Sequence, residues 1–300
     1  MTISQSKKVS VIVPNYNYGR YINKRIDSIV KQTYPIYELI VLDDCSSDDS
    51  VRIIEQKLAE VREKYPEVKI TFVRNEKNSG KAMLQWKKGF ELATGDYVWI
   101  AEADDLCSRR FLEEVMRGFD DPEVILSYTE SVIINSWGLI IAPNFRWSRD
   151  REKTGHYKKS YIKDGFREIE EIMAIRCTIP NVSAVVFKKS EKIPFDKYLE
   201  EAEQFMQVGD WHFYINVLKH GRISYNKKAL NRFRIHSGSV TSNSKKAKEN
   251  YKEIQKIHKL LAVSFNLDEF VTRRMINEEK RISKRIKNEK TESNCNNTSL

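Results

Sequence analysis

The sequence predicts an α/β protein in which helices flank a mixed, mostly parallel sheet, followed by a C-terminal helical extension. In the first hundred residues, short β-rich runs alternate with helical apolar spacing about every thirty residues, which is typical of βαβ units. Residues 245–287 carry apolar side chains at helical spacing among dense charge. The 300 residues, 40% hydrophobic and 31% charged, suit one large domain or two small ones and exclude wholly disordered chains.

Four strands are expected in the first hundred residues, at Val9–Val13, Tyr37–Leu42, Val68–Val73 and Asp96–Ala101. Apolar residues at helical spacing between them predict helices near residues 22–30, 54–61 and 83–90. Right-handed crossovers bring the loops after these strands to one edge of the sheet. Ligands of such sheets bind at that edge.

The middle of the chain is less regular. Strands are expected at Val124–Ile134, Leu139–Ile141, Asn181–Phe187 and Arg232–Ile235. Trp211–Leu218 is expected to form a helix that His220-Gly221 ends, and residues 145–165 are expected to form a loop. The last segment, 288–300, is expected to be frayed.

Charge and cysteine usage exclude several classes. The net charge is +10, but residues 245–290 hold 14 Lys and Arg against 7 Asp and Glu, so the basic surplus lies mostly in the tail and does not indicate nucleic-acid binding. Four scattered cysteines without a CxxC pair disfavour a zinc site or a disulfide scaffold and fit a reducing, cytoplasmic setting. No apolar run reaches the roughly 18 residues of a membrane span, and the N-terminal apolar stretch indicates a strand rather than a signal peptide.

Acidic residues follow two of the expected strands. Glu102-Ala103-Asp104-Asp105 comes after the fourth strand, where carboxylates suit a divalent cation that would neutralise a diphosphate. The alternative is that Asp105 only caps the next helix. Asp43 and Asp44 come after the second strand and can accept hydrogen bonds from a base or a ribose, although capping is again the alternative.

Three further residues stand as candidates. Tyr16, in the loop after the first strand, can stack on a planar base or simply cover the core. Asp210 lies at the start of a helix, where it is either an N-cap or an ionised base. His236 is a metal or phosphate ligand only if the fold returns it to the acidic loops.

Several nucleotide and nucleophile motifs are missing. No GxGxxG follows the first strand, Ser79-Gly80-Lys81 only imitates part of a P-loop, and no G-x-S-x-G elbow occurs. These absences disfavour dinucleotide-binding proteins, P-loop enzymes and α/β-hydrolases.

The order of the motifs resembles family 2 glycosyltransferases, which have the GT-A fold. The resemblance rests on VSVIVPNYNYGRYI, ELIVLDDCSSDDS and NSGKAMLQWKKGFELATGDYVWIAEADD over residues 8–118, and continues through GDWHFYINVLKHG and FRIHSGSVT to about residue 241. It implies a glycosyltransferase domain over 1–244, with nucleotide binding in 8–118 and acceptor binding in 119–244. Residues 245–300 would form a basic helical extension.

The resemblance also implies roles for individual residues. Pro14 and Tyr16 would line the nucleobase pocket, and either Asp43 or Asp44 would hold the base or ribose. Donor contacts would further include Asn78, Lys81, Glu102 and Asp104. The metal ligands would be Asp104, Asp105 and His236, and the catalytic base would be Asp210. Glu102 replaces the first aspartate of the Asp-x-Asp pattern, and Gly209-Asp210 replaces the usual Glu-Asp pair.

The activity so implied is inverting, metal-dependent sugar transfer from a UDP-, GDP- or dTDP-linked donor, with Mn²⁺ or Mg²⁺ as cofactor. The acceptor would be a saccharide or lipid-linked hydroxyl in bacterial cell-surface polysaccharide synthesis. The missing QxxRW signature argues against a processive synthase. A binding protein without transfer activity and a nucleotidyltransferase stay open as alternatives. The basic segment 245–290 either contacts the inner face of the plasma membrane or packs as a solvated cap.

Overall fold

The computed structural model describes residues 7–145, 155–236 and 247–296. Its strands are β1 (Val9–Asn15), β2 (Glu38–Asp43), β3 (Lys69–Arg74), β4 (Tyr97–Ile100), β5 (Leu106–Cys107), β6 (Val124–Ile134), β7 (Ile140–Ala142), β8 (Tyr161–Asp164), β9 (Val185–Lys188) and β10 (Arg222–Arg234). Its α-helices are α1 (Gly19–Val30), α2 (Ser50–Lys64), α3 (Ala82–Leu92), α4 (Phe111–Met116), α6 (Gly165–Glu168), α7 (Phe195–Ala202), α8 (Gly209–Leu218), α9 (Ala247–Ser264) and α10 (Glu269–Asn296). Shorter helical turns lie at Arg117–Asp120, His156–Lys158, Ile169–Met173 and Val182–Ala184.

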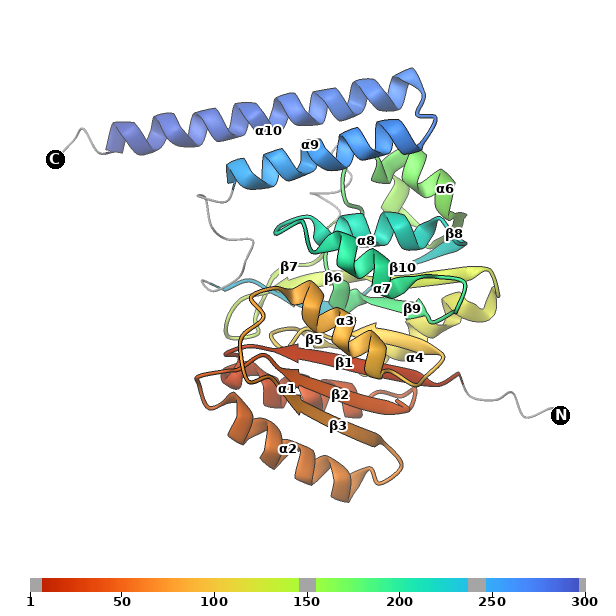
Figure 1. Ribbon diagram of the computed structural model, residues 1–300, viewed down its shortest axis with the longest axis vertical. Coiled ribbons are helices and arrows are strands. Elements are labelled where there is room, and N and C mark those ends of the chain that lie inside the picture. The colour runs from red at the N-terminus through yellow and green to blue at the C-terminus, as the bar shows by residue number, and fades with distance from the viewer. Residues whose placement is uncertain (1–6, 146–154, 237–246, 297–300) are drawn as a thin grey trace.

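One mixed sheet organises the molecule, in the strand order β3-β2-β1-β4-β9-β6-β10-β5. Strands β1 to β4 are parallel to one another, as the βαβ pattern predicts. Helices α1 and α2 lie to one side of this sheet, and α3, α7 and α8 lie to the other, with α9 and α10 beyond α8 (Figure 1). The predicted α/β architecture is confirmed.

The parallel half buries both faces of its strands. In β1, Val9, Val11 and Val13 pack into the core under α1 and α2, while Ile12 packs into the core that contains α3. Successive side chains of a strand point to opposite faces, so a β-rich run with few polar residues fits this two-sided burial. A Cβ added to Gly89 of α3 would come within 2.4 Å of Ile12 Cγ2, which shows how closely helix and strand approach.

The second half of the sheet differs more from the sequence expectation. Strand β9 runs antiparallel to β4 and β6, and residues 182–184 form a turn before it. Strand β10 covers thirteen residues, whereas only Arg232–Ile235 was expected. Register shifts around Asn226 and Ala229 interrupt its alternation. Of the expected loop 145–165, residues 146–154 lie outside the described residues, and β8 occupies part of the remainder.

The two C-terminal helices belong to the packed core. Ile257 and Leu261 of α9 and Met275 of α10 are buried in the same apolar cluster as α8. His258 of α9 lies 2.7 Å from Glu279 Oε1 and 3.2 Å from the Ile175 carbonyl oxygen. Helix α10 continues to Asn296, so residues 288–296 are helical rather than frayed. No helix over the described ranges is both long and apolar enough for a bilayer crossing.

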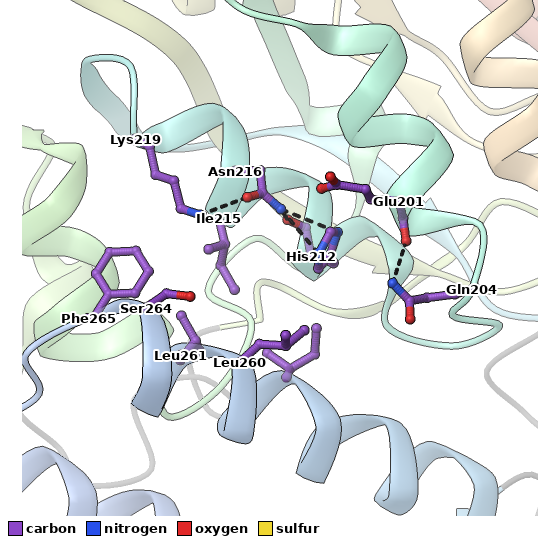
Figure 2. Close-up of a pocket in the computed structure, with 11 residues that line it drawn as sticks. Glu201, Gln204, His212, Ile215, Asn216, Lys219, Leu260, Leu261, Ser264 and Phe265 are labelled. Atoms are coloured by element: carbon purple, nitrogen blue, oxygen red, sulfur yellow. Dashed lines mark hydrogen bonds between the residues drawn. The ribbon is translucent and has the colours of Figure 1, made fainter.

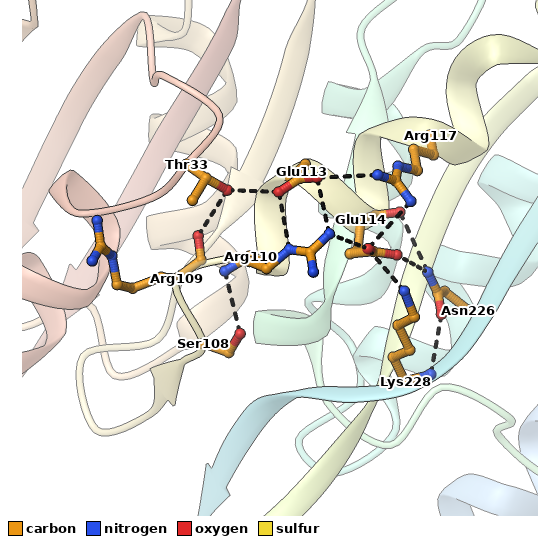
Figure 3. A network of polar contacts seen from close by, with 9 residues as sticks. All are labelled: Thr33, Ser108, Arg109, Arg110, Glu113, Glu114, Arg117, Asn226 and Lys228. Carbon is orange, nitrogen blue, oxygen red and sulfur yellow. Dashed lines mark hydrogen bonds and ion pairs between the residues drawn. The ribbon is translucent and has the colours of Figure 1, made fainter.

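An ionic network joins α4 to β10 (Figure 3). Its centre is Glu114, whose side chain is only 3% exposed and lies 2.9 Å from Lys228 Nζ. Arg110 and Arg117 approach the same carboxylate at 3.1 and 3.3 Å, and Asn226 Nδ2 donates to it at 3.2 Å. Burial acts to raise the pKa of Glu114, but hydrogen bonds from Lys228 and Asn226 outweigh it and hold that pKa below its usual value.

Replacing Glu114 by Gln is expected to destabilise the fold by about 1–3 kcal/mol near pH 7, because a buried charged hydrogen-bond acceptor is lost. Because folding lowers the pKa of Glu114, its ionised carboxylate stabilises the folded state at pH values above the ordinary carboxyl pKa. This contribution is lost as the pH falls through the lowered pKa. The difference from wild type should therefore shrink in acid. Urea unfolding at pH 7 and at pH 4 measures it. The exposed Glu55 of α2, replaced in the same way, should show a smaller change; equal losses would contradict the assignment.

Candidate active site

The first three loops of the site begin at one edge of the sheet. Asn15 of β1 pairs with Asp43 of β2, and the Asp44 backbone N–H donates to the Asn15 carbonyl at 2.9 Å. The Ala101 N–H after β4 donates to the Ile12 carbonyl at 2.8 Å. The parallel register therefore brings together the loops after β1, β2 and β4, as the sequence predicts.

The carboxylate of Asp43 stabilises the loop after β2. It is fully buried, and its carboxylate accepts from Asn15 Nδ2 at 2.8 Å and from the N–H and hydroxyl of Ser46 at 2.9 and 2.6 Å. These bonds shape the turn in which Cys45 adopts a left-handed backbone with φ of 63°. Asp43 thus supports the loop that presents its neighbour.

Asp44 connects the loop after β2 to the loop after β3. Its carboxylate accepts from Asn75 Nδ2 and Ser79 Oγ, both at 2.7 Å, and from Gln85 Nε2 at 2.9 Å. Asn78 Nδ2 donates to the Asp44 carbonyl at 3.1 Å. The Asp44 side chain and the candidate Asn78 therefore lie in one hydrogen-bonded unit.

The other two nucleobase candidates differ in exposure. Pro14 is buried within β1 opposite Leu42, so it can contribute only an edge of the pocket wall. Tyr16 is 46% exposed at the start of the next loop, and a planar base could stack on its ring. Asn17 closes that loop, because its Oδ1 accepts from the N–H groups of Ser47 and Asp48 at 2.8 and 3.2 Å.

Helix α3 joins the two acidic loops. Gln85 donates to Asp44, and the next residue, Trp86, donates from Nε1 to Glu102 Oε1 at 2.8 Å. Burial, together with the charge of Asp104, raises the pKa of Glu102 to about 8. The Trp86 contact and the raised pKa favour a hydrogen-bonding role for Glu102.

Asp104 meets His236 at the end of β10. His236 Nε2 lies 3.0 Å from Asp104 Oδ2, and the two side chains are 9% and 16% exposed. The imidazole also packs edge-on against the Tyr18 ring, with centroids 5.6 Å apart. Arg234 Nε donates to the Asp104 carbonyl oxygen, which fixes the end of β10 beside this loop. The fold thus returns His236 to the acidic loop, which was the condition for its having a role.

Asp105 does not share this position. It is 2% exposed, and its Oδ1 accepts from the Arg234 backbone N–H at 2.8 Å. Burial, together with the Asp104 charge, raises the pKa of Asp105 to about 7. Its carboxylate holds β10 in place, so the geometry disagrees with the expectation that Asp105 contacts a metal.

A divalent cation fits the Asp104–His236 pair only with help from a ligand. Among the described residues, no three His, Cys, Asp or Glu side chains come together as a complete metal site. Mg²⁺ is commonly held by one or two carboxylates plus substrate phosphates, and Mn²⁺ accepts oxygen ligands in the same manner. One carboxylate oxygen and one imidazole nitrogen at 3.0 Å therefore suit a cation whose other ligands are phosphate oxygens and water.

Asp210 is the second residue of α8 and is half-buried. Burial raises the pKa of Asp210 to about 6, although the Trp211 N–H donates to its Oδ1 at 2.7 Å. A Cβ on Gly209 would lie 2.9 Å from the Ala202 carbonyl oxygen. This close approach explains the absence of a glutamate at position 209.

The start of α8 lies beside α3, because a Cβ added to Gly209 would lie 3.6 Å from Met83 Cγ, and Tyr214 follows one turn after Asp210. The Tyr214 side chain is fully buried, and burial followed by the charges of Asp210 and, more weakly, Glu102 raises its pKa. The rings of Trp86 and Phe213 also lie 6.3 Å apart between centroids. The start of α8 therefore belongs to the same region as the end of β4.

Lys81 is placed differently from the other donor candidates. Its Nζ donates to the Glu203 carbonyl oxygen at 3.0 Å, in the segment between α7 and α8. Sequence reasoning also missed Gln85, Trp86 and Arg234. Gln85 and Trp86 stand at helix positions that face the core. A polar Gln at such a position was the one signal in the sequence that could have marked them.

Comparisons with known proteins agree with this geometry. A family model described as glycosyl transferase family 2 matches residues 10–174. TuaG of Bacillus subtilis, assigned to teichuronic acid biosynthesis as a glycosyltransferase, is 27% identical over 255 residues, covering 83% of this chain and 89% of TuaG. The poly(ribitol-phosphate) β-N-acetylglucosaminyltransferase TarP of Staphylococcus aureus is 34% identical over 113 residues, covering 36% of this chain. An uncharacterised Nostoc glycosyltransferase is 33% identical over 118 residues, covering 39%. The matches span only 32% of TarP and 34% of the Nostoc protein.

Solved structures extend the likeness beyond the family match. Residues 1–349 of S. aureus TarS, in complex with UDP-GlcNAc, align with a TM-score of 0.63 at 19% identity, covering 90% of this chain and 72% of that one. The mannosyltransferase PcManGT from Pyrobaculum calidifontis, in complex with GDP-Man and Mn²⁺, aligns with a TM-score of 0.58 at 19% identity, covering 93% and 70%. These likenesses confirm the expected GT-A fold. With the family match over more than half of its length, the chain belongs to glycosyl transferase family 2.

Proposed function

We propose that this chain transfers a sugar from a nucleotide-diphosphate donor to a hydroxyl of a saccharide or lipid-linked acceptor, with inversion at the anomeric carbon. The observation that carries the proposal is the grouping of Asp44, the Asp104–His236 pair and Asp210 around α3 and the carboxyl edge of the parallel strands. The similarity to TuaG and TarP supports a place in bacterial cell-surface polysaccharide synthesis.

The donor would lie across the loops after β1, β2 and β3. Tyr16 offers an exposed ring for the base, and the unit of Asp44 and Asn78 offers polar groups for the base or ribose. Both aspartates are buried, and Asp44 is the better candidate because its carboxylate bonds to the loop after β3, whereas that of Asp43 bonds to Asn15 and within its own turn. The UDP-GlcNAc and GDP-Man in the two solved structures support a nucleotide-sugar donor here.

The diphosphate would lie at Asp104 and His236. A divalent cation bound there would neutralise the charge that develops on the leaving diphosphate. Asp104 and His236 would orient it, and Glu102, held by Trp86, would hydrogen-bond to the donor. Asp105 would act only by holding Arg234 and β10 in place.

Asp210 would be the base. The acceptor oxygen attacks the anomeric carbon while the bond to the diphosphate breaks, and Asp210 takes the hydroxyl proton. Its pKa of about 6 leaves it ionised at neutral pH yet basic enough to accept a proton. A single displacement with one base inverts the anomeric configuration, which the anomeric proton coupling of the product reveals by NMR.

A nucleotide panel tests the proposed function. UDP, GDP and dTDP, each with and without Mn²⁺, are screened by thermal shift, and the matching sugar donors are then assayed for transfer. One nucleotide should stabilise the protein more with Mn²⁺, and its sugar should appear on an acceptor with inverted configuration. Binding without any transfer would favour a nucleotide-sugar-binding protein, and release of pyrophosphate from a nucleoside triphosphate would favour a nucleotidyltransferase.

The basic extension is proposed to contact an anionic membrane surface near a lipid-linked acceptor. Lys280 and Lys284 are exposed on α10, at the opposite end of the molecule from α2 (Figure 1). Each basic residue near such a surface adds about 1 kcal/mol, so Lys280→Gln with Lys284→Gln should weaken binding to anionic vesicles about tenfold or more. Co-sedimentation measures this. The matched change of Arg62 and Lys64 on α2 should have little effect; equal partitioning of all three proteins would dismiss the contact.

A further inference from the structure

Helix α9 reaches the segment that leads into α8. The carboxylate of Glu253 accepts three consecutive backbone N–H groups, from Met206 at 2.8 Å, Gln207 at 2.8 Å and Val208 at 3.3 Å. Glu253 is half-buried and lies 43 residues beyond Asp210 in the chain. A side chain of the C-terminal extension thus binds the backbone immediately before the proposed base.

One of these N–H groups, that of Val208, belongs to the N-cap of α8, and those of Met206 and Gln207 lie just ahead of the helix. Val208 precedes the first residue of α8 and has no side chain able to cap it, while its carbonyl accepts the first helical bond from His212 at 3.1 Å. The N–H groups at the start of a helix lack partners within the helix, and a negative charge there is favoured by the helix dipole. Glu253 provides both the acceptor and the charge.

The same segment is also fixed from the donor side. Lys81, in the loop after β3, donates to the Glu203 carbonyl oxygen at 3.0 Å. Gly209 packs against the Ala202 carbonyl oxygen so closely that an added Cβ would lie 2.9 Å from it. The segment 203–208 is therefore held by Lys81 of the loop after β3 and by Glu253 of α9. Asp210 lies two residues after this segment.

Apolar packing alone does not set how α9 sits against α8. A cavity of about 380 Å³ lies between α7, α8 and α9 (Figure 2). His212, Ile215 and Lys219 line it from α8, and Leu260 and Leu261 line it from α9. Side chains leave this space unfilled, so apolar contacts hold α9 against α8 less tightly here. The hydrogen bonds of the Glu253 carboxylate therefore contribute more to fixing the start of α8.

We propose that Glu253 is a positioning residue for the transfer reaction, acting through the segment 206–208 on the placement of Asp210. The inference rests on the proposed function, in which Asp210 is the base. Within the part of the chain that the structure describes, the Glu253 carboxylate bonds to residues 206–208 and not to the donor loops, so it should affect the chemical step and leave nucleotide binding unchanged.

Two variants and a matched control test the proposal in the full-length protein. Glu253→Gln keeps one oxygen as an acceptor but replaces the other with an amide NH₂ group, which would face backbone N–H groups of residues 206–208. Glu253→Ala removes both acceptor oxygens. We expect kcat to fall about tenfold in Glu253→Gln and further in Glu253→Ala, with donor KM unchanged and with an unchanged Kd, measured with Mn²⁺, for whichever of UDP, GDP and dTDP the panel selects. Glu249→Gln removes the same charge one turn earlier, from an exposed side chain, and should behave as wild type.

A double-mutant cycle separates positioning through Asp210 from a general structural role. In an Asp210→Asn background, Glu253→Ala should cause no additional loss of kcat. Wild-type kcat in Glu253→Ala, or the same fold-loss in both backgrounds, would overturn the proposal. Retained turnover in Asp210→Asn alone would instead overturn the proposed base, so the two failures are distinguishable.

Discussion

Replacing Asp210 by Asn is expected to lower kcat by about 10²–10⁴-fold, the usual contribution of a general base, and to leave nucleotide affinity intact. The amide keeps an oxygen for the Trp211 N–H, so the local structure should persist. Because the pKa of Asp210 is raised to about 6, wild-type kcat should rise with pH through that value and then level off. Steady-state rates between pH 5 and pH 8 check both statements.

Stability provides the control for this variant. Folding raises the pKa of the Asp210 carboxyl group. The folded state therefore loses stability as the pH rises from the ordinary carboxyl pKa to the raised pKa and beyond. At pH 7, Asp210→Asn should therefore unfold at a temperature equal to or above that of wild type. A variant that melts earlier would have lost activity through misfolding, and one that keeps near wild-type turnover would show that another group takes the proton.

Replacing Asp104 by Asn is expected to remove the metal response of the site. Asp104 is the carboxylate that faces His236, so binding of the nucleotide that the panel selects should no longer strengthen when Mn²⁺ is added. Turnover should fall by about 10²–10³-fold, which is typical of losing one charge-stabilising group in an active site. Calorimetric titration of that nucleotide with and without Mn²⁺ measures the first effect.

Asp105→Asn gives the contrasting result. Asp105 is buried with a raised pKa and accepts from the Arg234 backbone N–H, an acceptor that the amide oxygen of Asn keeps, so this variant should not melt earlier than wild type at pH 7 and the metal should still strengthen nucleotide binding. The two neighbouring carboxylates are thereby separated by function. If Asp105→Asn abolished the metal response and Asp104→Asn kept it, the roles assigned from the geometry would be reversed.

The first half of the fold was predictable because its signals are local. Runs such as Val9–Val13 are apolar on both faces, and the helices between them keep helical spacing. Strand β10 was not predictable over its full length, since Lys227 and Lys228 are exposed and register shifts break its alternation. Helix α7 and the antiparallel β9 depend on packing against distant segments, which no local pattern reveals.

The sequence indicates which polar residues follow the strands but not what each one contacts. Asp43 and Asp44 both follow a strand and both are buried, and their hydrogen-bond partners distinguish them. Asp104 and Asp105 are likewise adjacent, yet only Asp104 faces His236. Glu253 carried no signal, because its contacts are to backbone N–H groups 45–47 residues away.

The most direct measurement is a crystal structure of the wild-type protein with Mn²⁺ and an unreactive analogue of the donor that the nucleotide panel selects. The metal should contact Asp104 Oδ2 and His236 Nε2, the base should lie beside Tyr16, and the Asp210 carboxylate should face the anomeric carbon from the side opposite the diphosphate. A diphosphate bound away from Asp104, or an anomeric carbon beyond the reach of Asp210, would contradict the account.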